Sequence, residues 1–217
     1  MRVRHHLGLA LDRGPALRRR CLGQLRREAM GWDRPLDAAD LTMAVRVDGP
    51  VIDMGCGPGR FAAVFNRLGI PALGLDVSPA AVRLARRRGA EAVAQCVFGP
   101  VPGEGNWAYA ILPDGNIGIG GDPTRLLRRA TRLVIPGGTI HVELDPPDRE
   151  PGRVILRLGP GLQHNATVMP WARVTTAQFL RLAREVGLEV CETWNCQGRW
   201  FASATTSAES THRNGGT

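Results

Sequence analysis

The sequence predicts an α/β fold: a doubly wound, mostly parallel sheet with an antiparallel edge strand and helices on both faces. Three observations lead to this prediction. Strand and helix patterns alternate through residues 50–145, a glycine-rich turn follows the first strand, and the chain closes on a helix followed by two strands. Alternating strands and helices build parallel sheets because each helix carries the chain back across the sheet. Two strands without a helix between them predict antiparallel pairing at an edge.

The alternating region divides into units with recognisable ends. The pairs Ser-Pro at 78–79 and Asp-Pro at 122–123 each supply an N-cap and a first-turn proline for a helix. Expected strands span 51–54, 71–76, 91–97, 107–112 and 139–144, and expected helices span 60–68, 78–88 and 123–135. Further on, the pattern predicts a helix at 176–186 and strands at 188–194 and 199–205.

We expect one domain with additions, since a chain of 217 residues that is 43% hydrophobic suffices for a single core. The domain is assigned to 50–202, with an insertion at 151–174 built from two extended segments around a Gly-Pro-Gly turn. Residues 1–49 are expected to form a basic helical extension, which leaves open a role at a membrane surface or a partner. The Ser/Thr/Gly-rich stretch 203–217 is expected to be a disordered tail.

The chain is strongly basic, with a net charge of +8. Such a charge favours nucleic-acid binding when taken alone. All 28 basic residues are arginine, however, and together with abundant alanine, glycine and proline this indicates the codon bias of a GC-rich genome. We therefore expect a basic solvated surface, and a small molecule rather than nucleic acid as the substrate.

Several classes of protein are disfavoured by composition. No run of about 18 apolar residues is present, so no transmembrane segment is expected. The apolar run near the N-terminus is too short and interrupted for a signal peptide, which predicts a cytoplasmic protein. The cysteines are scattered and form no CxxC pair, so we expect reduced thiols and no metal site. They are Cys21, Cys56, Cys96, Cys191 and Cys196.

The segment VIDMGCGPGRF carries the most functional information. A buried strand ends in Asp53, and Gly55, Gly57 and Gly59 precede a helix. Glycines let the backbone approach a ligand, and the helix N-terminus offers free N–H groups to a carboxylate or phosphate. A dinucleotide-binding loop would need a small residue where this chain has Arg60, which disfavours a nicotinamide-dependent oxidoreductase.

A second acid follows at the end of the next strand. Asp76 lies 17 residues after Gly59, where a carboxylate can accept hydrogen bonds from both ribose hydroxyls of an adenosine. Ser78 is the better helix cap, which leaves Asp76 free to bind, and the neighbouring Val77 can pack on the adenine face.

These features resemble the class I S-adenosylmethionine-dependent methyltransferases, in particular small bacterial proteins of actinobacterial type. The resemblance covers roughly residues 50–145 and includes the strand WAYAIL, the loop PDGNIGIGGDP and the segment LVIPGGTIHVEL. It implies a Rossmann-like fold and S-adenosyl-L-methionine as cofactor. By this resemblance Asp53 organises the methionine end of the cofactor, and the glycines of the turn pass under it.

One position departs from the pattern of that family. Where its members place an acid that binds the adenine amino group, this chain has Cys96, whose thiol is a poor acceptor. The missing hydrogen bond costs on the order of 0.5–1.5 kcal/mol. Backbone groups at Val97 and Phe98 can still define the adenine edge, so weaker cofactor binding is expected rather than its loss.

Candidates for catalysis are fewer, because methyl transfer mainly requires alignment of the acceptor and exclusion of water. Asp114, in the loop after the fourth strand, is a candidate to bind the methionine ammonium or to polarise an acceptor. The alternative to such a functional role is that Asp114 and Gly115 only form a turn. His164 lies in the insertion, where Met169 and Trp171 could wall an apolar pocket, whereas His141 lies inside a strand and is expected to be a core residue.

The function expected from these residues is methyl transfer from S-adenosyl-L-methionine to an oxygen or nitrogen atom of a small molecule. An RNA or protein methyltransferase is the alternative within the same class. The absence of an evident base also leaves open a methyltransferase-like protein that binds without catalysis.

Overall fold

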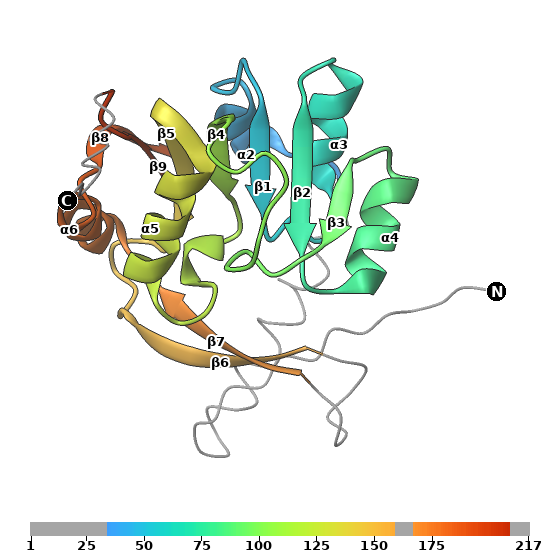
Figure 1. Ribbon diagram of the computed structural model, residues 1–217. Coiled ribbons are helices and arrows are strands. Elements are labelled where there is room, and N and C mark those ends of the chain that lie inside the picture. Colours follow the sequence, from blue (N-terminus) through green and yellow to red (C-terminus); the bar gives the residue numbers. More distant parts are fainter. Residues whose placement is uncertain (1–33, 159–166, 209–217) are drawn as a thin grey trace, which may run out of the picture.

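The computed structural model describes residues 34–158 and 167–208. Its main feature is a seven-stranded sheet with the strand order β3-β2-β1-β4-β5-β9-β8 (Figure 1). The strands are β1 (Val51–Met54), β2 (Ala72–Asp76), β3 (Ala92–Ala94), β4 (Trp107–Leu112), β5 (Val134–Leu144), β8 (Glu189–Cys196) and β9 (Arg199–Thr205). β1 to β5 pair in parallel, and β9 pairs antiparallel with both β5 and β8. The predicted fold class is confirmed.

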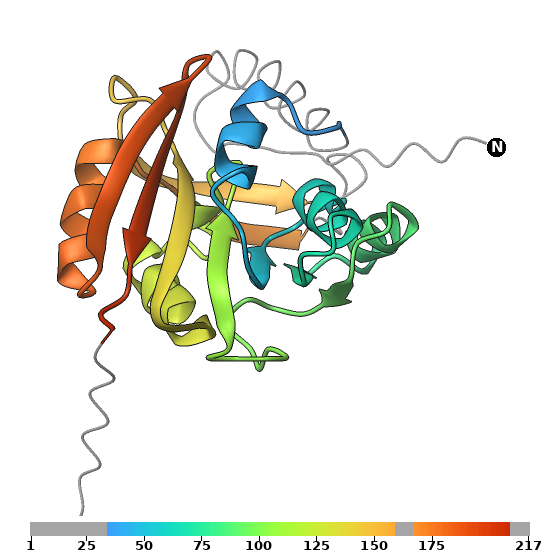
Figure 2. The ribbon, with the colours of Figure 1, turned by 90° about the horizontal axis from the view of Figure 1, so that it is seen from above.

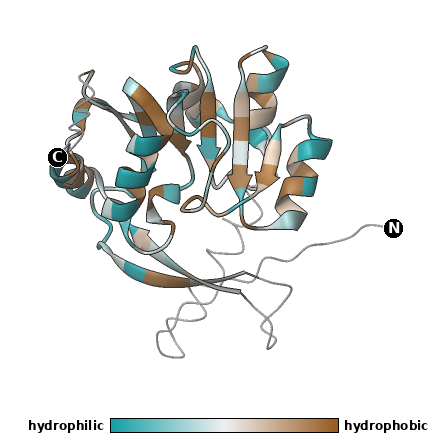
Figure 3. Cartoon of the chain, viewed as in Figure 1, coloured by the Kyte–Doolittle hydropathy of each residue, from teal (hydrophilic) through white to brown (hydrophobic). Residues whose placement is uncertain are grey.

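The helices divide between the two faces of the sheet, as the view in Figure 2 shows. They are α2 (Ala38–Ala44), α3 (Arg60–Arg67), α4 (Pro79–Arg87), α5 (Pro123–Leu133) and α6 (Thr176–Glu185). Buried residues of α2, α3 and α4 belong to one apolar cluster, and those of α5 and α6 belong to the other. Apolar colouring accordingly gathers on the central strands in Figure 3.

The helices begin where the local sequence predicts. The side chain of Ser78 accepts a hydrogen bond from the Ala81 N–H, and Asp122 caps the backbone N–H of Arg125 in the same way. In both helices proline occupies the first turn, where its missing N–H costs no hydrogen bond. Since α4 and α5 start at the carboxyl ends of their strands, these caps help to fix the loops at that edge of the sheet.

Two expected domain boundaries need correction. Helix α2 lies in the part assigned to the N-terminal extension, yet Ala39 and Met43 are fully buried against the sheet, so α2 belongs to the core. Strand β9 runs to Thr205, beyond the expected end of the domain at residue 202, because its last residues pair with β5 and β8. Residues 1–33 of the expected basic extension and the part of the expected tail beyond residue 208 lie outside the described residues.

The insertion forms an antiparallel hairpin, as predicted. Strands β6 (Gly152–Leu158) and β7 (Thr167–Arg173) pair along their whole length, and in Figure 1 they lie beyond the carboxyl ends of β1 and β2. The hairpin contacts η1 (Asn116–Gly118), the short helix after β4. The loop that follows β4 is therefore covered on one side. None of the helices described in the structure is long and apolar enough to cross a membrane.

Candidate functional site

The glycine turn lies at the switch point of the sheet, where β1 has β2 on one side and β4 on the other. Open α/β sheets bind ligands in the crevice at this point. Gly55, Gly57 and Gly59 all have positive φ, at 83°, 52° and 74°. At Gly59 an added Cβ would come within 2.6 Å of Ala85, so glycine lets α4 pack closely. At Gly57 nothing lies within 4 Å of such an atom, which leaves that face of the turn open to a ligand.

Asp76 connects the glycine turn to the start of α4. Its carboxylate accepts hydrogen bonds from the Gly57 N–H at 2.9 Å and from the Ser78 N–H at 2.8 Å. Burial raises the pKa of Asp76, and these two donors oppose that rise. Each carboxylate oxygen keeps a further lone pair, so the group can still accept from a ligand.

Asp53 is a buried acid with an unsatisfied oxygen. Its side chain is 1% exposed, and Oδ1 has no hydrogen-bond partner among the described residues. Burial raises the pKa of Asp53 to about 7. The positive charge of Arg60 opposes this rise, whereas the negative charge of Asp114 adds to it. A buried carboxylate oxygen without a partner is a position that a hydrogen-bond donor or a cation would complete.

The segment after β3 lies beside Asp76, because the Gln95 N–H donates to the Asp76 carbonyl at 2.9 Å. Cys96 is exposed, whereas the neighbouring Val97 is buried. Just after the end of β2, Val77 is 49% exposed, which is unusual for a valine next to a buried strand. The residues predicted to contact an adenine thus lie on neighbouring segments.

Arg129, which was not among the residues predicted from the sequence, holds the segment after β3 in place. From α5 its guanidinium donates to the carbonyls of Val97 at 2.9 Å and Gly99 at 2.6 Å, and it also pairs with Glu104. An arginine on an amphipathic helix predicts only a solvated side chain, so no local signal indicated this role.

A network of ion pairs covers the carboxyl ends of β1, β4 and β5. Arg60, only 5% exposed, contacts Asp40 at 3.2 Å and Asp114 at 2.8 Å. Arg199 reaches Glu143 at 2.7 Å and Asp40 at 2.8 Å. Burial alone would raise the pKa of Asp40, but hydrogen bonds from neighbouring arginines hold it well below its usual value. The network is charged and largely enclosed.

Asp114 is therefore part of an ion pair. Its backbone lies in the left-handed region at φ 56°, and its N–H donates to the Glu143 carboxylate at 2.7 Å. The side chain is 20% exposed. This backbone conformation is that of a turn, which is the alternative to a functional role, and the side chain faces Arg60. The other candidate, His164, lies outside the described residues.

His141 is a core residue, as predicted. It is 3% exposed, its Nδ1 lies 2.7 Å from the Ser203 hydroxyl, and its ring stacks on Tyr109. Burial lowers the pKa of His141 to about 4, so the imidazole is neutral near pH 7.

The loop after β4 joins the glycine turn to the hairpin. Asn116 donates from Nδ2 to the carbonyls of Met54 at 3.0 Å and Gly55 at 2.9 Å. Two residues on, a Cβ at Gly118 would lie 2.0 Å from the Ala172 carbonyl of β7, so only glycine allows this contact. Side chains and backbone together thus fix the wall opposite the glycine turn. No cluster of three or more metal-ligating side chains occurs in the part of the chain that the structure describes.

Comparison with known proteins agrees with this geometry. A family model described as a methyltransferase domain matches residues 33–193. No curated protein matches the chain.

Among solved structures, a Bacteroides fragilis S-adenosylmethionine-dependent methyltransferase in complex with S-adenosyl-L-homocysteine is 18% identical, with a TM-score of 0.69 over 95% of this chain and 89% of that one. The Burkholderia thailandensis 1,6-didemethyltoxoflavin-N1-methyltransferase is 17% identical, with a TM-score of 0.62 over 94% of this chain and all of that one. A protein from Methanosarcina mazei is 14% identical, with a TM-score of 0.62 over 81% and 100% of the two chains. These similarities show a shared fold.

Proposed function

The chain belongs to the methyltransferase domain family, and from this premise we propose that it transfers a methyl group from S-adenosyl-L-methionine to an oxygen or nitrogen atom of a small molecule. The observation that carries the proposal is the open glycine turn joined to a partly exposed acid at the end of β2. Gly57 leaves room for a ligand, and the Asp76 carboxylate is fixed beside it.

The residues present fit this cofactor. Asp76 would accept hydrogen bonds from the ribose hydroxyls, and Val77 and the backbone at Cys96 and Val97 would hold the adenine. The unsatisfied Oδ1 of Asp53, in the strand before the turn, would accept a hydrogen bond from the methionine end of the cofactor. When bound, the sulfonium supplies an already activated methyl group, so the protein has little bond-making chemistry to perform.

The remaining task of the chain is to orient the acceptor and to exclude water. Asn116 fixes the backbone of the glycine turn, and the hairpin covers the loop after β4. Asp114 stays a candidate to orient a donor group of the acceptor, through the lone pairs that Arg60 leaves unused. His164, which lies outside the described residues, stays a candidate base.

Two similar structures support a small-molecule acceptor. One is the enzyme of toxoflavin methylation, solved with 1,6-didemethyltoxoflavin bound, and another is named a glycopeptide N-methyltransferase.

The cofactor is tested by thermal unfolding. S-adenosylhomocysteine is expected to raise the melting temperature, and NADH is not, because Arg60 blocks the loop geometry of a dinucleotide site. Stabilisation by NADH alone would contradict the proposal. Transfer of labelled methyl to small amines and alcohols, but not to RNA or to protein, is expected next. Labelling of RNA alone would instead support the alternative within this class.

Arg129 provides a test of the adenine side. Arg129→Gln removes the donors to Val97 and Gly99, and the affinity for S-adenosylhomocysteine is expected to fall about ten-fold, or roughly 1.4 kcal/mol. Calorimetry measures the change, and Arg181→Gln on the exposed face of α6 serves as the control. A normal affinity in a folded Arg129→Gln protein would show that this segment does not contact the cofactor.

A further inference from the structure

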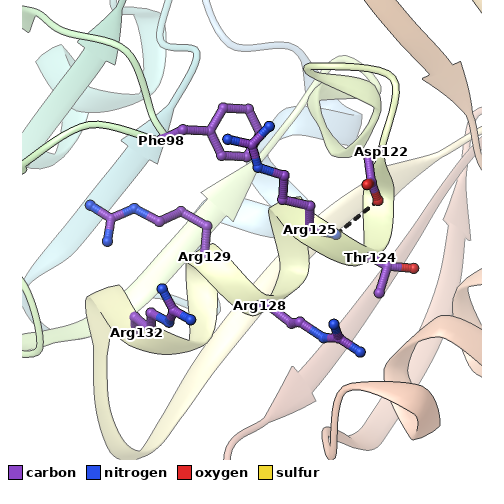
Figure 4. A pocket seen from close by; sticks show the side chains of 7 residues that line it. All are labelled: Phe98, Asp122, Thr124, Arg125, Arg128, Arg129 and Arg132. Carbon is purple, nitrogen blue, oxygen red and sulfur yellow. Dashed lines mark hydrogen bonds between the residues drawn. The ribbon is translucent and has the colours of Figure 1, made fainter.

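A hollow of about 320 Å³ lies against α5 on the outer side of the segment that follows β3. Figure 4 shows it from close by. Its lining is dominated by arginine side chains and one aromatic ring: Phe98, Asp122, Arg125, Arg128, Arg129 and Arg132. It is separate from the glycine turn, since no residue of that turn lines it.

The arginines share one face of α5. Their positions, 125, 128, 129 and 132, follow the spacing of three and four residues that places side chains on one side of a helix. The opposite face is buried in the core through Leu126, Leu127, Ala130 and Leu133. The helix therefore presents a continuous cationic face to the hollow.

Two of these arginines have carboxylate partners and two do not. Arg129 pairs with Glu104 and holds two backbone carbonyls, and Arg128 lies 3.7 Å from Glu185. Neither Arg125 nor Arg132 forms an ion pair with any described residue. Arg125 instead lies over the ring of Phe98 at 4.2 Å, while Arg128 is directed away from that ring (Figure 4).

We propose that this hollow binds a small molecule that bears a phosphate group. Guanidinium groups match phosphate oxygens with paired N–H donors. Arg125 and Arg132, which form no ion pair with a described residue, match the charge of a phosphate monoester. The volume is that of a small-molecule site rather than of an extended polymer groove. Phe98 offers an apolar surface to the rest of the ligand, beside the charged end.

Occupancy of the hollow also affects the methyl-donor site, a consequence that depends on the proposed function. Phe98 and Arg129 line the hollow, and both belong to, or hold, the segment that contains Cys96 and Val97. A ligand that fixes Arg129 changes the position of this segment and hence the affinity for the adenosine part. By linkage, the cofactor changes the affinity for phosphate by the same factor.

Binding is tested on the full chain without any methyl donor. Thermal shift and calorimetry with inorganic phosphate, pyrophosphate and glucose 6-phosphate are compared with chloride at equal ionic strength. Phosphate compounds are expected to stabilise the protein beyond chloride. The double variant Arg125→Gln/Arg132→Gln is expected to weaken their binding at least ten-fold.

The matched control is Arg83→Gln/Arg87→Gln, which removes the same charge from exposed positions of α4. Equal weakening in both double variants would overturn the proposal, because it would mean diffuse charge attraction. Binding no stronger than that of chloride would overturn it as well and leave a solvated helix face. Tighter binding of a short oligothymidylate than of any small phosphate would show a nucleic-acid interface instead. None of these results depends on whether S-adenosylhomocysteine binds.

Discussion

Replacing Arg60 by glutamine is expected to lower the free energy of unfolding by about 3–5 kcal/mol, the usual cost of breaking a buried ion pair by removing one partner. Arg60 is 5% exposed and lies between Asp40 and Asp114, of which Asp40 is fully buried. Glutamine keeps much of the size of the side chain but removes its charge. Asp114 then loses its main cationic partner. Asp40 stays fully buried and keeps only Arg34 and Arg199.

Thermal or denaturant unfolding measures this effect. For a domain of this size each kcal/mol corresponds to about 2–4 °C, so the melting temperature is expected to fall by roughly 6–20 °C. Arg87→Gln, on an exposed face of α4, is the control and is expected to stay within about 0.5 kcal/mol of the parent. A loss below about 1 kcal/mol in Arg60→Gln would show that Arg34 and Arg199 suffice to balance the charge of Asp40.

The second large effect concerns Asp76. Asp76→Ala removes the acceptors for the ribose hydroxyls, and the affinity for S-adenosylhomocysteine is expected to fall by about ten- to a hundred-fold, or roughly 1.5–3 kcal/mol. Asp76 also accepts from the N–H groups of Gly57 and Ser78, so part of the loss comes from a looser turn. Asp76→Asn keeps one acceptor oxygen. Its affinity for S-adenosylhomocysteine is expected to lie between that of the parent and that of the alanine variant.

Calorimetry provides the affinities, and circular dichroism confirms that each variant is folded. Glu91→Gln changes the charge of an exposed acid just after α4 and is expected to bind normally. An alanine variant that is folded and binds with unchanged affinity would refute the assignment of Asp76 to the ribose.

Local sequence determined the sheet and the residues around the glycine turn. Alternating apolar runs and capped helices specify parallel strands. The helices of these units have their own start signals, such as the N-caps Ser78 and Asp122. The glycine turn and the acid at the end of β2 were also predictable, since both are defined by spacing within one β-α-β unit. The prediction of a core role for His141 followed from its place in an apolar strand in the same way.

Tertiary structure alone decided the ion pairs at the carboxyl ends of β1, β4 and β5. Arg60 and Asp114 are 54 residues apart, and Arg199 and Asp37 are 162 apart, so no local pattern pairs them. The contact of Arg129 with Val97 likewise crosses 32 residues.

The same reason explains the misplaced domain start. Whether a short helix such as α2 joins the core depends on an open sheet face that only the folded chain provides. Hydrophobic periodicity and caps act between neighbours in the chain, whereas ion pairs and surface burial act between neighbours in space.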